Sequence, residues 1–300
     1  MFAITGATGN TGSVIAERLL AHGQKVRVIG RDISRLARLV QKGAEAAAAD
    51  LTDADALARA FGGASAVYAL VPPNLSAADV RGYQETVTDA LASAIGKASV
   101  THVVALSSVG ADKSEKTGPV VGLHNLEQKL NAIAGLNAVY LRAGYFMENT
   151  LGQVEVIRNF GVVAGPLRPD LRVSMIATHD IGAAAAEILR NRAFSGKQAR
   201  ELLGARDLDY REVASVIGQA IGRPELAYVQ LPAPQLKPAF MQMGMSSTMA
   251  DLILEMAEAL NSGYMIALEP RSAANTTPTT FETFVAEEFV PRFQGRAAGA

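Results

Sequence analysis

The chain has 300 residues, 49% of them hydrophobic, which is enough to bury the core of one large domain or of two closely joined ones. It contains no cysteine and only four scattered histidines, which excludes disulfides, thiol catalysis and thiolate metal sites and argues against any built-in metal. A net charge of −1 argues against direct nucleic-acid binding, and the lack of a long apolar run argues against a membrane span, so we expect a cytoplasmic protein.

Short runs rich in β-forming residues alternate with longer helical patterns in the first half of the chain. The predicted strands cover residues 2–5, 25–29, 44–48, 66–70, 101–107 and 138–142, and the predicted helices cover 12–22, 34–42, 54–61, 77–98 and 123–134. Gly23 follows the first helix at the position where glycine commonly ends one. Such alternation predicts an α/β fold with a doubly wound parallel sheet, a Rossmann domain, over residues 1–150.

The pattern loosens after residue 150. We expect a helix with Asp180 as its N-cap, then a strand, a turn and an amphipathic helix that ends at Gly222 and Pro224. Two helices are expected within residues 233–261 and a last one over 281–293. Residues 151–300 are therefore predicted to form mainly a smaller α/β substrate-binding domain, with some segments returning to the Rossmann domain.

Three evenly spaced glycines, Gly6, Gly9 and Gly12, follow the first strand and begin the first helix. Glycine lets a backbone approach an anion closely, and a helix N-terminus offers unpaired N–H groups to that anion. The segment Gly6 to Gly12, with Thr8, Asn10 and Thr11 between the glycines, is therefore predicted to bind the pyrophosphate of a dinucleotide. A glycine turn used only for packing is the alternative.

The motif T-G-A-T-G-N-T-G resembles that of the NAD(P)-binding short-chain dehydrogenase/reductase superfamily. The whole chain is similar to the atypical, NmrA-like branch, which includes NADPH-dependent quinone reductases and triphenylmethane reductases. The resemblance is carried by RVIGRD, ADLTD, ALSSVGA, LRAGYFMEN, GARDLDYREVASVIGQAIGRP and TPTTFETFVAEEF, in chain order. LRAGYFMEN, taken together with the glycine motif, is the more specific signal.

Arg31 stands after the second strand, where an NAD-specific fold has an acidic residue for the ribose hydroxyls. An arginine there pairs well with the 2′-phosphate of NADP, and Ser34 and Arg35 are close in sequence. NADP(H) is therefore favoured over NAD(H). The alternative, kept open by the adjacent Asp32, is that Arg31 is a solvated loop charge.

Two further pairs of residues follow the next strands. The resemblance implies that Asp50 and Leu51, after the third strand, contact the adenine. Val71 and Pro72, at the end of the fourth strand, lie where the chain would pass the nicotinamide ribose. Because proline fixes its backbone and lacks an N–H donor, a rigid rim without cofactor contact is the alternative for the second pair.

The usual catalytic tyrosine of the superfamily is absent. Ser107 and Ser108 follow the fifth strand as expected, but if Glu127 matches the glutamate of the family's helix, Val120 and His124 occupy the tyrosine and lysine positions. Reduction of an ordinary ketone needs an acid for the developing alkoxide, whereas quinones and cationic dyes need much less help. His124 is the candidate proton donor or ribose ligand, with a structural hydrogen bond as the alternative.

Aromatic and methionine side chains supply the candidate acceptor site. Tyr145, Phe146 and Asn149 follow the sixth strand and suit a flat apolar molecule, although aromatic residues there are equally typical of a core. Met243 lies in a methionine-rich stretch with Met241 and Met245, and such flexible side chains suit an adaptable lid.

Two functions are consistent with these features. The first is an NADPH-dependent oxidoreductase that transfers hydride to a quinone or similar electron-poor apolar acceptor without the usual Tyr-Lys pair. The alternative is a non-catalytic NADP(H)-binding redox sensor of the NmrA type. The apolar candidate site favours the reductase, and the missing tyrosine disfavours an epimerase of nucleotide sugars. The pattern leaves open whether the protein is a monomer or a homodimer.

Overall fold

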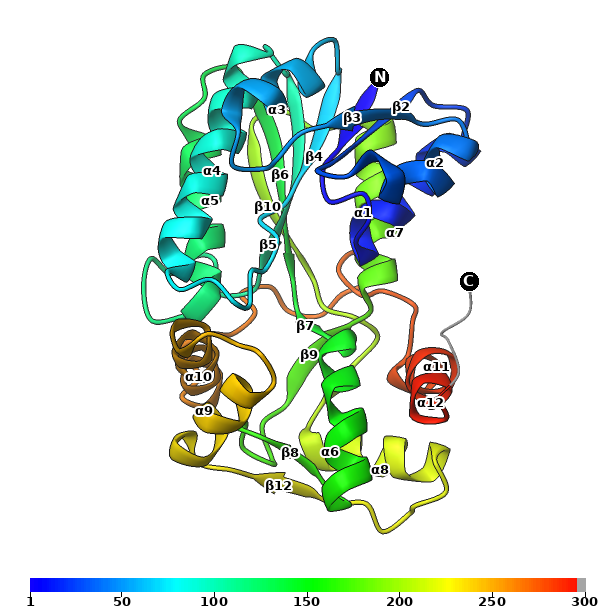
Figure 1. Cartoon of the computed structure of the whole chain (residues 1–300), viewed down its shortest axis with the longest axis vertical. Helices are drawn as coiled ribbons and strands as arrows, with labels where there is room; N and C mark the ends of the chain where they lie inside the picture. The colour runs from blue at the N-terminus through cyan, green and yellow to red at the C-terminus, as the bar shows by residue number, and fades with distance from the viewer. Residues whose placement is uncertain (296–300) are drawn as a thin grey trace.

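The computed structural model describes residues 1–295 and divides them between an upper body built on a large sheet and a lower body of smaller sheets and helices (Figure 1). The large sheet has seven parallel strands in the order β10-β6-β5-β4-β1-β2-β3. Its strands are β1 (Phe2–Ile4), β2 (Val26–Gly30), β3 (Glu45–Ala48), β4 (Ala66–Ala69), β5 (His102–Ser108), β6 (Asn137–Ala143) and β10 (Lys197–Leu202). The chain reverses direction across the sheet between β1 and β4, as in a doubly wound fold.

Helices cover both faces of this sheet and bury its two apolar sides. The helices are α1 (Asn10–Ala21), α2 (Ala37–Gln41), α3 (Ala54–Phe61), α4 (Val80–Lys97), α5 (Val121–Asn131) and α7 (Thr178–Asn191). One core lies under α1 and α7 and the other under α3, α4 and α5. Because both faces are covered, β1, β4 and much of β5 and β6 read as continuous apolar runs.

The lower body contains two small sheets and the remaining helices. Its strands are β7 (Tyr145–Phe146), β8 (Val163–Gly165), β9 (Val173–Ile176), β11 (Asp207–Leu208) and β12 (Tyr228–Gln230), and its helices are α6 (Gln153–Phe160), α8 (Tyr210–Ala220), α9 (Ala233–Gln242), α10 (Ser247–Asn261), α11 (Phe281–Phe284) and α12 (Val290–Phe293). A separate apolar core fills this body. Within residues 1–295 no helix is long and apolar enough to cross a membrane.

A long segment without helix or strand, the strap (residues 262–280), joins α10 to α11 and runs between the two bodies, in orange in Figure 1. Its Met265 packs against Gly110, just after β5. Glu201, buried at the end of β10, accepts hydrogen bonds from the backbone N–H groups of Leu268 (2.9 Å) and Glu269 (2.8 Å). The strap is thus held against the carboxyl edge of the large sheet.

Most predicted elements of the first half are confirmed, with changes at their ends. The strands and helices predicted before residue 150 all occur, except that the predicted helix 34–42 is a short 3-10 helix at Ile33–Leu36 followed by α2. The last predicted helix, 281–293, is continuous from α11 to α12 through a π-helical turn at Val285–Phe289. The large sheet has a seventh strand, β10, beyond the six predicted in the first half.

The prediction for Asp180 was wrong. Helix α7 begins at Thr178 with Ala177 as its N-cap, so Asp180 lies in the first turn. Its buried carboxylate instead accepts hydrogen bonds from the backbone N–H (2.9 Å) and hydroxyl (2.7 Å) of Thr279. A residue about one hundred positions away in the chain therefore decides its role, which a local capping pattern could not reveal.

Candidate active site

The glycine turn between β1 and α1 is too tight for side chains at its key positions. Gly6 has φ of +60°, and a Cβ at Gly12 would lie 2.3 Å from the carbonyl oxygen of Gly6. Gly9 is the N-cap of α1, where no side chain caps the helix, and the first turn holds no acidic residue. The first N–H groups of α1 therefore remain available to an anion, as a bound pyrophosphate requires.

The other residues of the turn divide between surface and core. Thr8, Gly9 and Asn10 are exposed, and so can face a ligand. Thr11 is buried, and its hydroxyl accepts a hydrogen bond from Tyr68 of β4 at 2.9 Å. The Thr11 side chain thus fixes α1 to the sheet, and only its backbone N–H is left for a cofactor.

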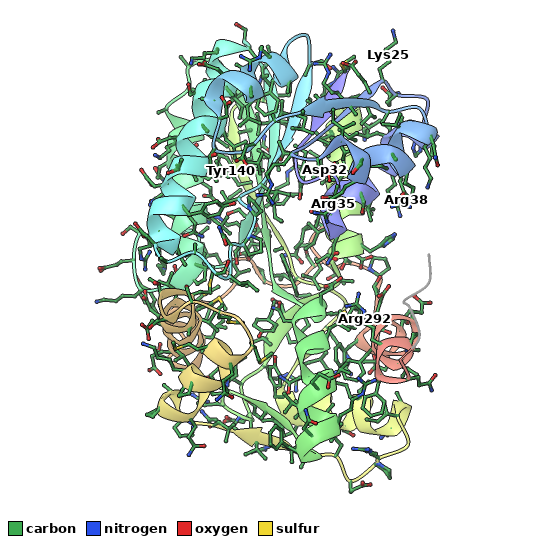
Figure 2. The ribbon with its side chains drawn as sticks, viewed as in Figure 1. Lys25, Asp32, Arg35, Arg38, Tyr140 and Arg292 are labelled. Carbon is green, nitrogen blue, oxygen red and sulfur yellow. The ribbon has the colours of Figure 1, made fainter. Side chains whose placement is uncertain are left out.

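Arg31 follows β2 directly and is exposed, and no carboxylate of residues 1–295 forms an ion pair with it. The neighbouring Asp32 is already engaged, because its carboxylate caps the next turn by accepting from the backbone N–H (2.9 Å) and hydroxyl (2.6 Å) of Ser34. These hydrogen bonds lower the pKa of Asp32. Figure 2 shows Asp32 and Arg35 about halfway down the upper body, with Lys25 at its upper end.

The residues predicted to border the adenine and the nicotinamide ribose lie at the carboxyl ends of β3 and β4. Asp50 accepts from the backbone N–H (2.9 Å) and hydroxyl (2.8 Å) of Thr52, and these bonds lower its pKa, as does the charge of Arg31 to a smaller degree. Leu51, Val71 and Pro72 are half-buried. Each presents a partly exposed apolar surface at the edge of the sheet.

Ser107 and Ser108 have different surroundings. The buried hydroxyl of Ser107 donates to Glu127 at 2.6 Å, and Glu127 also forms a two-point ion pair with Arg142 at 3.0 and 2.6 Å. Ser107 therefore belongs to a closed network beneath the site. Ser108 is half-buried, and its hydroxyl donates to the carbonyl oxygen of Val109 at 2.9 Å. The sequence analysis missed the Glu127–Arg142 pair because its partners come from different elements.

Val120 and His124 are the residues predicted to occupy the positions of the usual tyrosine and lysine. Val120 is buried with Ala111, Ala259 and Met265. His124 is half-buried, and its Nδ1 lies 2.9 Å from the carbonyl oxygen of Ala111, so in the neutral ring Nδ1 carries the proton and Nε2 is left with a lone pair. His124 thus holds the loop after β5 and retains one nitrogen for a ligand.

Tyr145 and Phe146 form β7, which begins the lower body immediately after β6. Tyr145 forms a hydrogen bond with Tyr210 of α8 (3.3 Å), and burial raises its pKa, so it remains a neutral hydrogen-bonding group. Phe146 is half-buried against the core of the upper body, and Asn149 is exposed. These side chains lie where the two bodies meet.

Glu148, in the same segment, makes a contact that the sequence analysis did not predict. One of its carboxylate oxygens accepts hydrogen bonds from the backbone N–H (2.9 Å) and the hydroxyl of Thr178 at the start of α7, and the other is buried without a partner among the described residues. Burial raises the pKa of Glu148. No local pattern signals this contact, since thirty positions separate the two residues.

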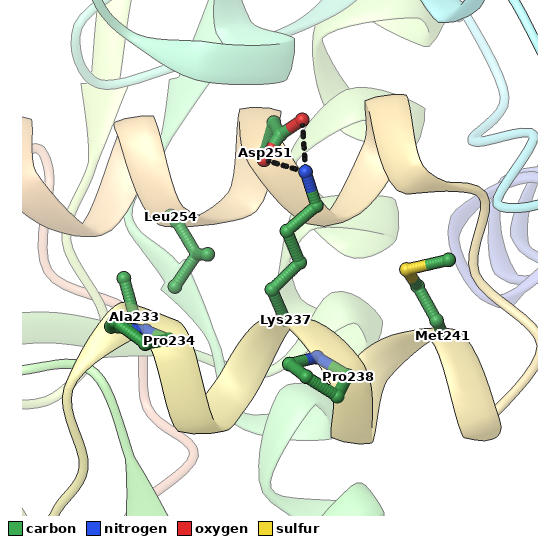
Figure 3. A pocket seen from close by; sticks show the side chains of 7 residues that line it. All are labelled: Ala233, Pro234, Lys237, Pro238, Met241, Asp251 and Leu254. Atoms are coloured by element: carbon green, nitrogen blue, oxygen red, sulfur yellow. Dashed lines mark hydrogen bonds and ion pairs between the residues drawn. The ribbon is translucent and has the colours of Figure 1, made fainter.

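Of the three methionines predicted to form an adaptable lid, Met241 and Met243 are exposed and Met245 is half-buried. Met243, which caps the end of α9, is 59% exposed, and Met241 is 46% exposed. Met241 lines a depression of about 510 Å³ between α9 and α10, which Lys237 spans to pair with Asp251 at 2.7 Å (Figure 3). Within the described residues no cluster of acidic or histidine side chains could hold a metal ion.

Comparison with known proteins identifies relatives along nearly the whole chain. A model of the NmrA-like family matches residues 1–285. An NAD(P)H azoreductase of Xenophilus azovorans is 30% identical over 258 residues, which cover 85% of this chain and 86% of the relative. Quinone oxidoreductase 2 of Escherichia coli is 26% identical over 260 residues, with coverage of 85% and 86%.

Two solved structures share the fold. An NADPH-dependent quinone oxidoreductase of Escherichia coli complexed with NADPH has a TM-score of 0.77 at 22% sequence identity, covering 100% of this chain and 96% of that one. A triphenylmethane reductase of Citrobacter sp. complexed with NADP(H) has a TM-score of 0.77 at 17% identity, with coverage of 96% and 100%. At these identities the structural match establishes the common fold.

Proposed function

The chain belongs to the NmrA-like family and is an NAD(P)H-dependent reductase, and we propose that it transfers hydride from NADPH to a quinone or a similar electron-poor, apolar acceptor. Its glycine turn fits a dinucleotide, because a Cβ at Gly12 would collide with the backbone of Gly6 and because nothing caps the first N–H groups of α1. Arg31, free of carboxylate partners among the described residues, supports the preference for the 2′-phosphate.

The observation that carries the choice of acceptor is the packing of Val120. This apolar residue, predicted to stand at the position of the proton-donating tyrosine, is buried with Ala259 and Met265. Ser107 cannot replace it, because its hydroxyl is committed to Glu127. A site without a strong acid suits an acceptor whose anion is delocalised, such as a quinone, better than it suits a ketone.

The bound nicotinamide would supply the hydride, while the protein binds, orients and partly shields the reactants. Hydride addition reduces the quinone by two electrons and leaves a hydroquinone anion, which takes its proton from water or from Nε2 of His124 when that ring is in its imidazolium form. The residues Tyr145, Phe146 and Asn149 would form one side of the acceptor site, and Met243 an adaptable opposite side. If water alone can supply this proton, His124→Phe should lower kcat less than tenfold. Loss of an essential general acid typically lowers kcat far more than that.

The test measures NADPH and NADH oxidation with a small quinone and with a simple ketone, beside calorimetric binding of both nucleotides. We expect quinone-dependent oxidation well above the rate without protein, faster with NADPH than with NADH, and none with the ketone. Tight NADP(H) binding without turnover on any quinone or dye would contradict the reductase hypothesis and favour the redox-sensor hypothesis. Preference for the ketone would refute the argument from Val120.

A further inference from the structure

Tyr83, in the first turns of α4, lies beside the predicted adenine site without belonging to any motif. Its ring is half-buried and packs on the core under α3 and α4, together with Leu51, which follows β3, and Val71, which follows β4. Three partly exposed apolar side chains from three elements therefore lie along one side of the sheet. Such an arrangement suits a flat ring that enters from the carboxyl edge of the strands.

The hydroxyl of Tyr83 has no hydrogen-bond partner among the described residues. The hydroxyls of three other tyrosines, Tyr68, Tyr140 and Tyr228, donate to Thr11, Asn131 and the carbonyl oxygen of Leu167 at 2.8 to 2.9 Å. A tyrosine with a half-buried ring usually finds a partner for its hydroxyl. The fold leaves this one available to a ligand.

Tyr83 also lies within the electrostatic reach of the two charged residues of the predicted nucleotide site. Burial and the negative charge of Asp50 raise its pKa, and the positive charge of Arg31 opposes them. Arg31 follows β2, Asp50 follows β3, and Tyr83 belongs to α4, so the fold brings three separate segments together. Tyr83 therefore adjoins both the apolar and the charged part of the site.

We propose that Tyr83 forms a wall of the nucleotide site, with its ring packed against the adenine between Leu51 and Val71 and its hydroxyl free to hydrogen-bond the nucleotide. This assignment rests on the proposed dinucleotide binding. Aromatic side chains commonly bind bases in this way, because every base offers a flat π face. Tyr83 would then contribute affinity for the adenine half without taking part in hydride transfer.

Calorimetry with NADP⁺ and with adenosine 2′,5′-bisphosphate, which contains only the adenine half, tests the proposal. Tyr83→Leu should weaken both ligands about tenfold or more through loss of stacking. Tyr83→Phe, which keeps the ring, should weaken them only about threefold. Tyr264→Leu, an exposed tyrosine of the strap, is the matched control and should bind both like the original protein.

A measurement on the unaltered protein removes any dependence on the folding of the variants. Adenosine 2′,5′-bisphosphate should protect Tyr83 from nitration by tetranitromethane, read by mass spectrometry, while Tyr264 stays reactive. Unchanged binding by Tyr83→Leu, or unprotected Tyr83 in a protein that binds the bisphosphate, would overturn the proposal and leave the dinucleotide site standing. If the unaltered protein binds neither ligand, both the assignment and the proposed function fail.

Discussion

At the scale of single residues, the proposed preference for NADP over NAD can be tested at Arg31. Its guanidinium is exposed and has no carboxylate partner among residues 1–295, so Arg31→Ala removes a group available to the 2′-phosphate without breaking an internal ion pair. A charge-assisted hydrogen bond of this kind is worth about 1.5–3 kcal/mol, so calorimetry should show NADP⁺ affinity reduced at least tenfold and NAD⁺ affinity unchanged.

Arg38→Ala is the control for a general loss of positive charge, because Arg38 of α2, on the same side of the upper body as Asp32 and Arg35 (Figure 2), pairs with Glu17 at 2.6 Å. It should change NADP⁺ affinity less than twofold, as expected for a largely screened surface charge. Equal losses of NADP⁺ affinity in the two variants would mean that Arg31 acts only through the overall electrostatic field of the protein.

Glu148 gives a second prediction at this scale, through pH. Burial raises its pKa above the ordinary value of 4.5, so over a range above that value the folded protein binds more protons than the unfolded chain. The free energy of unfolding therefore falls as pH rises through this range. Glu148→Gln keeps a carbonyl oxygen for Thr178 and removes the titration, so its stability relative to the original protein should improve with rising pH.

Denaturant unfolding of Glu148→Gln and the original protein, measured side by side at several pH values from below 4.5 to neutrality, checks this sign. At the acid end the two proteins carry the same charge at position 148 and should differ by a constant. A difference in unfolding free energy that does not vary with pH would show that the carboxyl group titrates alike in the folded and unfolded states.

At the scale of elements, the start of α1 depends on Gly12. A Cβ there would meet the carbonyl oxygen of Gly6 at 2.3 Å, so Gly12→Ala must push the helix away from the glycine turn. Overpacking of this kind costs about 1–3 kcal/mol of stability, and displaced N–H groups should reduce NADP⁺ affinity at least tenfold. Thermal unfolding and calorimetry measure the two effects.

Gly96→Ala, within α4, is the matched control, because an added Cβ at Gly96 meets nothing within 4 Å. Alanine is the better helix former by about 0.8–1.0 kcal/mol, so this variant should be slightly more stable and bind NADP⁺ normally. Normal NADP⁺ binding by Gly12→Ala would contradict the assigned role of the turn.

The distance along the chain between interacting residues explains which features the sequence could predict. The elements of the first half follow from local signals, such as apolar runs, helical periodicity and the glycines, and these act within a few residues. Asp180 and Glu148 could not be assigned in this way, because their partners Thr279 and Thr178 come from other segments. Likewise, the network of Glu127 and Arg142 exists only after α5 packs beside β6.

At the scale of the whole molecule, the strap connects the two bodies through contacts that no sequence pattern predicts. β10 joins the large sheet as its seventh strand, and its buried Glu201 binds the strap backbone at Leu268 and Glu269. Arg271 continues the attachment by donating to the carbonyl oxygens of Leu203 and Gly204. A carboxylate with two backbone donors is thus a principal link between the strap and the sheet.

Glu201→Gln tests that link. The amide retains one acceptor oxygen, but its NH₂ group faces a backbone N–H and cannot accept a hydrogen bond from it, so one of the two strap donors loses its partner. We expect faster hydrogen exchange throughout the strap, with unchanged exchange in β1 and β4, because local opening need not unfold the sheet. Glu269→Gln, an exposed neighbour, should leave exchange unaltered. Uniformly faster exchange, β1 included, would instead make Glu201 part of the global stability of the sheet.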